Sequence, residues 1–117
     1  MAYYETFVAP VRVEKLDEYF AISAQMVPIW KELGVISLLD ARPDNAPTGK
    51  LTSFPQSVMC DDDEVPVFGF MVFRDRAHRD EVMEKAMERA DMNALMMKAP
   101  LDGKRMIFGG FVAEIET

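Results

Sequence analysis

The sequence predicts one α+β domain, with a four-stranded antiparallel sheet that carries two helices on one face. Segments rich in aromatic and β-branched residues alternate with segments of helical hydrophobic period, in the order β-α-β-β-α-β. That order is the ferredoxin-like, split-βαβ arrangement. A length of 117 residues fits a single domain covering residues 1–117. Two of the strands are apolar on both faces, which bears on assembly.

In the first half of the chain, a strand precedes a long amphipathic helix and a second strand. The segment "YYETFVAPVRV" (3–13) has the residue types that favour a strand. Residues 15–34 predict a helix that ends at Gly34, and residues 35–41 predict a short strand. The apolar stripe of this helix repeats at steps of three and four residues: Leu16, Tyr19, Ser23, Met26, Val27, Trp30 and Leu33.

The second half repeats the pattern with two strands around a second helix. The segment "VPVFGFMVF" (65–73) predicts a strand. Asp75 is placed to cap a helix running from about Arg76 to Ala90. We expect one more short helical turn at residues 92–97 and the final strand at residues 105–116.

The strand at residues 65–73 is apolar on both of its faces. The alternating sets are Val65, Val67, Met71 and Phe73 on one side, and Phe68, Phe70 and Val72 on the other. An antiparallel strand with one face in water should alternate apolar and polar residues, and two helices cover only one face. Leaving five or six such side chains in water would cost roughly 1.5–3 kcal/mol each. We therefore expect a homodimer packed sheet to sheet.

The composition argues against several classes of partner. With 20 acidic and 13 basic residues the net charge is −7, which disfavours nucleic acid and anionic membrane surfaces. The lone cysteine, Cys60, cannot form an internal disulfide, and the N-terminus lacks the pattern of a signal peptide, so we expect a cytoplasmic protein. One histidine and one cysteine cannot form a zinc site. We expect neither a metal nor a cofactor.

The only histidine, His78, lies among Arg74, Arg76 and Arg79 in the segment "RDRAHRDEV". It belongs to the apolar stripe of the second helix, which predicts that it points inward. The helix N-terminus and the arginines disfavour the imidazolium, so we expect a neutral ring. Two roles stay open: a packed histidine that donates to a backbone carbonyl, or a base or hydrogen-bond donor at the mouth of a pocket. The arginines either pair with neighbouring acids or bind an anion.

A cavity between sheet and helices would have a lining that can be named in advance. The candidates are Trp30, Phe70, His78, Met83 and Phe108. Methionine adapts to irregular space and to ligands, and the chain has ten of them. The same residues could equally form a filled core.

The connection between the second and third strands, residues 42–64, is long for a hairpin. It is either a lid over a ligand or a segment that packs on a partner subunit. The lid candidates are Lys50, Thr52, Ser53 and Phe54. Residues 51–54 and 56–60 could form a small extra strand or ribbon. In the last strand, we expect Gly109 and Gly110 to permit a bulge or a close approach at the dimer seam.

Three segments carry a resemblance to a known family. These are "GKLTSFP" (49–55), "RAHRDEV" (76–82) and "GKRMIFGGF" (103–111). In this order they resemble the YbaA-like family of small bacterial proteins of unknown function, over almost the whole chain. The resemblance implies the dimeric α+β barrel superfamily, which includes cofactor-free monooxygenases of polycyclic aromatics, lactone isomerases and haem enzymes. Its members share a fold and not a chemistry, and the resemblance supplies no catalytic residues.

Two functions of different class follow as expectations. The first is a cofactor-free enzyme or binder that acts on a small apolar or aromatic molecule in the cavity, with His78 as its polar group. The second is a non-catalytic dimeric module with an accessory or metabolite-sensing role. The inward position of His78 favours the first, and the lack of a convincing acid–base pair favours the second.

Overall fold

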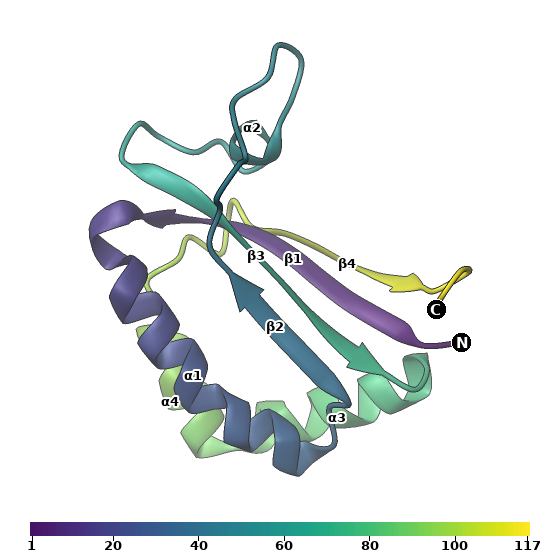
Figure 1. The fold of residues 1–117 in the computed structure, drawn as a ribbon. Coiled ribbons are helices and arrows are strands. Elements are labelled where there is room, and N and C mark those ends of the chain that lie inside the picture. Colours follow the sequence, from purple (N-terminus) through teal and green to yellow (C-terminus); the bar gives the residue numbers. More distant parts are fainter.

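The computed structural model describes residues 1–117 as a sheet with a layer of helices on one of its faces (Figure 1). The sheet has four antiparallel strands in the order β2-β3-β1-β4. The strands are β1 (Tyr3–Arg12), β2 (Ser37–Ala41), β3 (Glu64–Phe73) and β4 (Ile107–Val112). The chain therefore has the α+β, ferredoxin-like fold that its sequence predicts.

Three helices make the second layer: α1 (Leu16–Leu33), α3 (Arg76–Glu88) and α4 (Ala90–Lys98). A 3₁₀ turn, η1 (Val13–Lys15), leads into α1, and the four-residue α2 (Phe54–Ser57) belongs to the connection that projects beyond the sheet (Figure 1). The face of the sheet opposite to α1, α3 and α4 carries no helix (Figure 1). None of the helices combines the length and the apolar character that crossing a bilayer requires.

The predicted helix boundaries rest on local chemistry that the structure confirms. Asp75 caps α3, since its Oδ1 accepts the backbone N–H of His78 at 2.8 Å. Gly34 ends α1 with φ of +107°, in the left-handed region that glycine enters at little cost. The extended backbone of Arg89 separates α3 from α4, where the sequence predicted only a short last turn.

The register of the strands decides which residues meet the helices. β1 pairs with β3 along its whole length, from Tyr3 opposite Phe73 to Arg12 opposite Glu64. The odd-numbered residues of both strands face the helices. Several of them pack with side chains of the helices into two apolar clusters. One consists of Ile29, Trp30, Val35, Phe73, Val82, Ala86 and Met92, and the other of Ala9, Val11, Tyr19 and Val67.

The helix-free face consists of the even-numbered residues of β1 and β3 and of the odd-numbered residues of β2 and β4 that pair with them. Several of its large side chains lie in water. Phe111 is 64% exposed and Ile107 is 47% exposed, while Phe68 and Leu39 are partly exposed. Phe70 lies between Tyr4 and Phe68 in edge-to-face contacts. The strand alternation that the sequence showed therefore leaves an apolar surface on one side of this chain.

Two local expectations were wrong, and a third was wrong in one of its two alternatives. Residues 51–60 form no strand or ribbon; they contain α2, whose N-cap Ser53 accepts the Gln56 amide. The last strand, β4, is half as long as expected. It pairs with β1 in an unbroken register through Gly109 and Gly110, so the glycines mark no bulge. The other role expected of them, a close approach at a dimer seam, stays a prediction. Gly110 instead leaves room for the ring of Tyr3.

Candidate functional site

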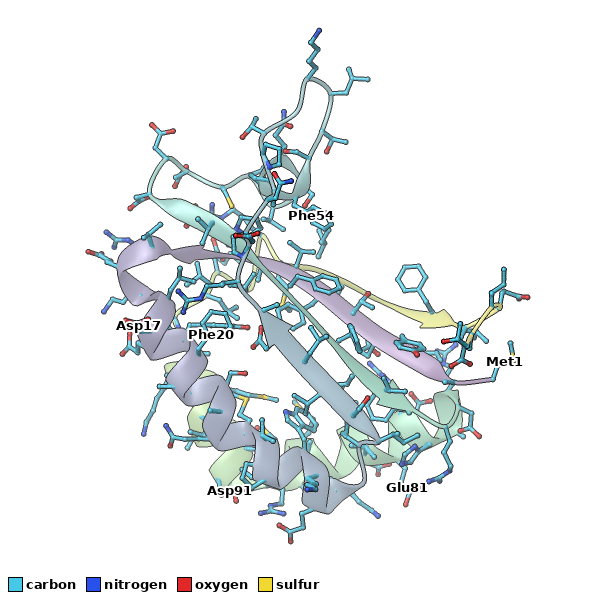
Figure 2. All side chains as sticks on the ribbon, viewed as in Figure 1. Met1, Asp17, Phe20, Phe54, Glu81 and Asp91 are labelled. Carbon is cyan, nitrogen blue, oxygen red and sulfur yellow. The ribbon has the colours of Figure 1, made fainter.

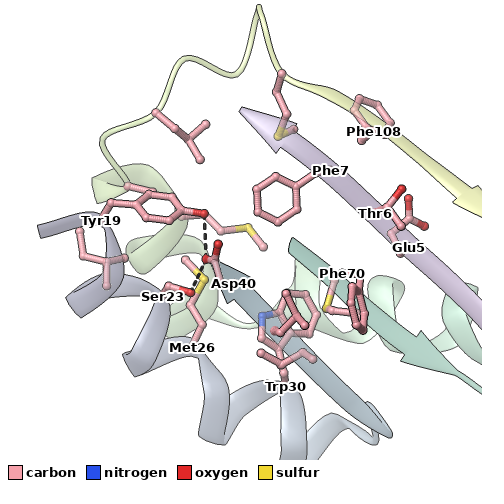
Figure 3. A pocket seen from close by; sticks show the side chains of 18 of the residues that line it. Glu5, Thr6, Phe7, Tyr19, Ser23, Met26, Trp30, Asp40, Phe70 and Phe108 are labelled. Atoms are coloured by element: carbon pink, nitrogen blue, oxygen red, sulfur yellow. Dashed lines mark hydrogen bonds between the residues drawn. The ribbon is translucent and has the colours of Figure 1, made fainter. Parts of the chain in front are cut away.

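A cavity of about 440 Å³ lies between the helical layer and the sheet. Of its 20 lining residues, 15 are hydrophobic, so it offers an apolar interior of the size that small molecules occupy. Four of the five residues proposed from the sequence border it, namely Trp30, Phe70, Met83 and Phe108. Phe70 directs its ring to the helix-free face of the sheet, against Tyr4 and Phe68. Figure 3 shows how α1, β1, β2 and β3 surround this space. Phe108 lies at its rim, because β4 is an edge strand and the Phe108 side chain is 70% exposed.

A buried carboxyl group forms the polar end of the cavity. Oδ2 of Asp40 accepts the hydroxyl of Tyr19 at 2.8 Å and the hydroxyl of Ser23 at 2.7 Å (Figure 3). Its other oxygen, Oδ1, is buried and has no hydrogen-bond partner. One oxygen of the carboxyl group thus accepts two hydrogen bonds, and the other oxygen is shielded from water and accepts none.

The local sequence explains why these three groups meet. Tyr19 and Ser23 are four residues apart on α1, so they share one face of the helix. Asp40 and Leu38 alternate toward the helices on β2, opposite Gly69 and Met71 of β3. Packing of α1 along β2 then brings the two hydroxyls onto the carboxyl.

Burial governs the protonation of this cluster. It raises the pKa of Asp40 above the usual 3.8, and the hydrogen bonds from Ser23 and Tyr19 only partly oppose it. Burial also raises the pKa of Tyr19 far above its usual value, helped by the negative charge of Asp40. Tyr19 therefore remains a protonated donor, and the Asp40 carboxylate is poorly solvated in its charged form.

A second polar group on the cavity wall is an ion pair. Nε of Arg79 lies 2.6 Å from Oε1 of Glu5, and its Nη1 lies 3.0 Å from Asp80. Burial disfavours the charge of Arg79, yet its pKa is raised because the hydrogen bonds to Glu5 and Asp80 outweigh that effect. Arg79, and Arg76 at 4.0 Å from Asp80, thus pair with acids, which is one of the two alternatives that the sequence left open.

His78 is inward-facing but does not line the cavity. Its side chain is 6% exposed at the junction of β3 and α3, edge-on to Phe73 with 5.6 Å between ring centroids. Nδ1 accepts the backbone N–H of Arg74 at 3.1 Å, so Nδ1 carries no proton and the neutral ring is protonated at Nε2. The sequence had proposed the opposite polarity, with the ring donating to a carbonyl.

The lid candidates also lie away from the cavity. Lys50, Thr52, Ser53 and Phe54 sit on the projecting connection, and none of them lines it. Figure 2 shows Phe54 at the far side of the sheet from Asp17 and Asp91, which mark the outer surface of the helices. Arg105 fixes the base of the connection, with 2.7 Å contacts to both oxygens of Glu64. None of the four lid candidates therefore covers the cavity in the single chain.

Sequence reasoning missed Asp40, the most unusual polar group of the site. A signal was present, since residues 35–41 are apolar apart from Ser37 and this acid, and Ser23 interrupts the apolar stripe of α1. Two polar groups at positions that should face a core indicate that they meet there. No group of three or more His, Cys, Asp or Glu side chains is arranged to hold a metal ion.

Comparison with known proteins places the chain in a family. A family model described as "Protein of unknown function (DUF1428)" matches residues 2–103. The chain is 33% identical over 116 residues to the uncharacterized protein YbaA of Escherichia coli K12, covering 99% of each.

Two solved structures are similar at the level of the fold. A dimeric ferredoxin-like protein from an uncultured marine organism matches with a TM-score of 0.62 at 12% identity, over 100% of both chains. A dimeric ferredoxin-like protein of unknown function from Jannaschia sp. CCS1 matches with a TM-score of 0.64 at 11% identity, over 97% of this chain and 100% of that one. The sequence matches carry the assignment, and the chain belongs to the YbaA-like family of proteins of unknown function, DUF1428.

Proposed function

We propose that this protein binds a small, largely apolar or aromatic molecule in the cavity between α1, α4 and the sheet. The observation that carries the proposal is the cavity itself. It has a volume of about 440 Å³ and a hydrophobic lining interrupted by a few converging polar groups, which is the usual constitution of a small-molecule site. A simple filled core would leave no such space. The proposal requires no cofactor and no metal.

Binding is common to a cofactor-free enzyme and to a metabolite-sensing module. The Asp40 carboxyl supports the enzyme, because a buried acid with a raised pKa can accept and return a proton. The non-catalytic module is supported by the position of His78, whose only free lone pair is taken by the Arg74 amide. We favour a binder whose polar group is Asp40 rather than His78.

The protein is also proposed to be a homodimer joined through the helix-free face. That face exposes Phe68, Ile107 and Phe111 side by side around a shallow apolar hollow. Two proteins of similar fold are described as dimeric, which supports a second copy as the occupant. Such an interface leaves the cavity on the opposite face of each sheet open. A cytoplasmic location fits the single free thiol of Cys60.

A thermal-shift screen with a panel of small aromatic compounds tests the binding proposal, since any ligand of the native state raises the apparent melting temperature. Ala99→Trp, which places a large ring on the cavity wall, should abolish the shift. Ala21→Trp makes the same change at an exposed position of α1 and should keep it. A shift that survives Ala99→Trp, or its absence throughout the panel, would reject the cavity as the site.

Sedimentation equilibrium at micromolar concentration tests the assembly. We expect a species of twice the chain mass of 13.3 kDa. A single-chain species at all concentrations would overturn the sheet-to-sheet dimer without touching the binding proposal.

A further inference from the structure

We propose that the ligand of the cavity is a neutral aromatic molecule whose ring is held by the thioether sulfurs of the methionines that border the cavity. This inference rests on the proposed binding function and names the chemical class of the ligand. It selects an aromatic ring over a saturated apolar one, and it assigns that selection to methionine side chains.

Methionines from five different segments of the chain meet at the cavity. Half of the ten methionines border it, namely Met26 of α1, Met71 of β3, Met83 of α3, Met96 of α4, and Met106, which directly precedes β4. Met71 is an odd-numbered residue of β3 and Met106 continues the even-numbered set of β4, so both lie on the face of the sheet that carries the helices. The helices supply the other three from the opposite side.

These methionines keep free surface beside the cavity. Met96 is 38% exposed, and the other four are half-buried. A methionine that only fills a core is enclosed, as Met92 is at 0% exposure in the cluster between the helices and β3. The bordering methionines are therefore placed to contact a ligand, and their flexible, unbranched side chains can adjust the sulfurs to its shape.

An aromatic ring forms part of the cavity floor. The ring of Phe7 crosses over Gly69 of the neighbouring strand, with its Cε1 2.5 Å from the position that a Cβ of Gly69 would take. Gly69 is an odd-numbered residue of β3, so this position is on the helical side of the sheet, and the Phe7 ring lies against the cavity (Figure 3). Ring and thioethers together offer an aromatic ligand contacts at its face and at its edge.

The polar groups on the wall are engaged within the protein and leave the choice of ring to the apolar lining. Oδ2 of Asp40 accepts the hydroxyls of Tyr19 and Ser23, and Oδ1 is buried. Glu5 is paired with Arg79 at 2.6 Å, so a charged ligand would lose its hydration without gaining a partner. Between neutral ligands, the polarizable sulfurs favour an aromatic ring at about 5 Å, since a saturated ring has no π-system to offer.

A matched pair of alcohols tests the inference: 3-phenyl-1-propanol and 3-cyclohexyl-1-propanol. They share the chain and the hydroxyl and differ only in the ring. The saturated ring is the more hydrophobic, so burial of apolar surface alone would favour the cyclohexyl compound. We expect the wild-type protein to bind the phenyl compound about fivefold more tightly in an NMR titration, through several sulfur–ring contacts. With isotope-labelled methionine methyl groups, the ring current of the phenyl compound should shift the signals of the cavity methionines.

Replacing sulfur with carbon separates thioether contact from shape. The triple variant Met26→Leu, Met71→Leu and Met83→Leu roughly conserves the volume of each side chain. It should still bind both alcohols, but its affinity for the phenyl compound should no longer exceed that for the cyclohexyl compound, because the sulfur–ring contacts are lost.

The control is the triple variant Met59→Leu, Met87→Leu and Met97→Leu, at methionines that are at least 64% exposed and do not border the cavity; it should keep the wild-type preference. Equal affinity in the wild-type protein, or tighter binding of the cyclohexyl compound, would overturn the inference and leave the binding proposal standing. A preference that persists in the cavity variant would overturn it as well. If neither alcohol binds, both proposals fail. The wild-type comparison decides the question even if the cavity variant does not fold.

Discussion

Replacing His78 with alanine should lower the free energy of unfolding by about 1–4 kcal/mol and leave binding in the cavity unchanged. Loss of the Nδ1 acceptor leaves the Arg74 amide, now bonded at 3.1 Å, without a partner, which costs about 1–3 kcal/mol. Loss of the edge-to-face contact with Phe73 costs about 0.5–1.5 kcal/mol more. The better helix propensity of alanine offsets about 0.5 kcal/mol of this.

A second variant separates the hydrogen bond from the ring, and a third serves as the control. In His78→Asn, the side-chain oxygen lies close to the place of Nδ1 and can accept the same amide. Its loss of stability should therefore be smaller than that of His78→Ala by about 1 kcal/mol. Arg76→Ala changes a neighbour whose side chain is 78% exposed and should unfold at the wild-type urea concentration.

Urea unfolding followed by circular dichroism measures all three variants, and calorimetry with a cavity ligand measures binding. A change in His78→Ala of less than about 0.5 kcal/mol, the usual size for a surface position, would refute the structural role. Weaker ligand binding with unchanged stability would do so too, and would return His78 to the list of site residues.

Three more outcomes are expected. Burial raises the folded pKa of Asp40 above its usual 3.8, so the folded state holds this proton more tightly than the unfolded state. As the pH rises from below 3.8 to neutral, the wild-type protein should therefore lose stability relative to Asp40→Asn, which does not titrate. Urea unfolding at a series of pH values measures this, and the reverse trend would contradict it. Phe111→Glu should halve the mass seen in sedimentation, whereas Ile115→Glu, beyond the end of β4, should not; equal behaviour would exclude the helix-free face as the interface. Gly110→Ala should lower the free energy of unfolding, measured in urea, by about 1–3 kcal/mol, because the first tyrosine ring of β1 fills the space of a Cβ. Gly109→Ala should be tolerated, because its Cβ would meet nothing closer than 3.6 Å.

The elements that the sequence predicts well are those whose signals are local. Asp75 before a periodic stretch and Gly34 after one are helix boundaries that need no tertiary information. The doubly apolar strand around Phe70 predicts a sheet with both faces in use. Pattern and caps together were enough for the order of elements and for the fold.

The connection was predicted less well, because short apolar runs do not distinguish strand from helix. Residues 56–60 were read as a ribbon, yet the pair Ser53 and Gln56 has the spacing of a capping box, which marks a helix start. Gln56 Oε1 in turn accepts the Ser53 hydroxyl at 2.7 Å. That spacing was the signal for α2.

The candidate site shows where local reasoning ends. Periodicity places both His78 and Trp30 on inward faces, but only Trp30 reaches the cavity, because the first turn of α3 lies against the end of β3. The meeting of Tyr19 with Asp40 joins residues 21 positions apart. It depends on the packing of α1 along β2, which no window of the sequence contains.

The strand order β2-β3-β1-β4 has a consequence for the chain as a divisible object. Every pair of neighbouring strands joins one half of the sequence to the other: β1 pairs with β3 and β4, and β2 pairs with β3. Cleavage of the chain within the projecting connection, for example near the 98% exposed Leu51, would yield two fragments. Neither fragment would contain two strands that are neighbours in the sheet. Neither fragment can build a piece of this sheet alone, and each is the template for the other. The fold is thus suited to complementation, in which two separate peptides regain structure only by finding one another.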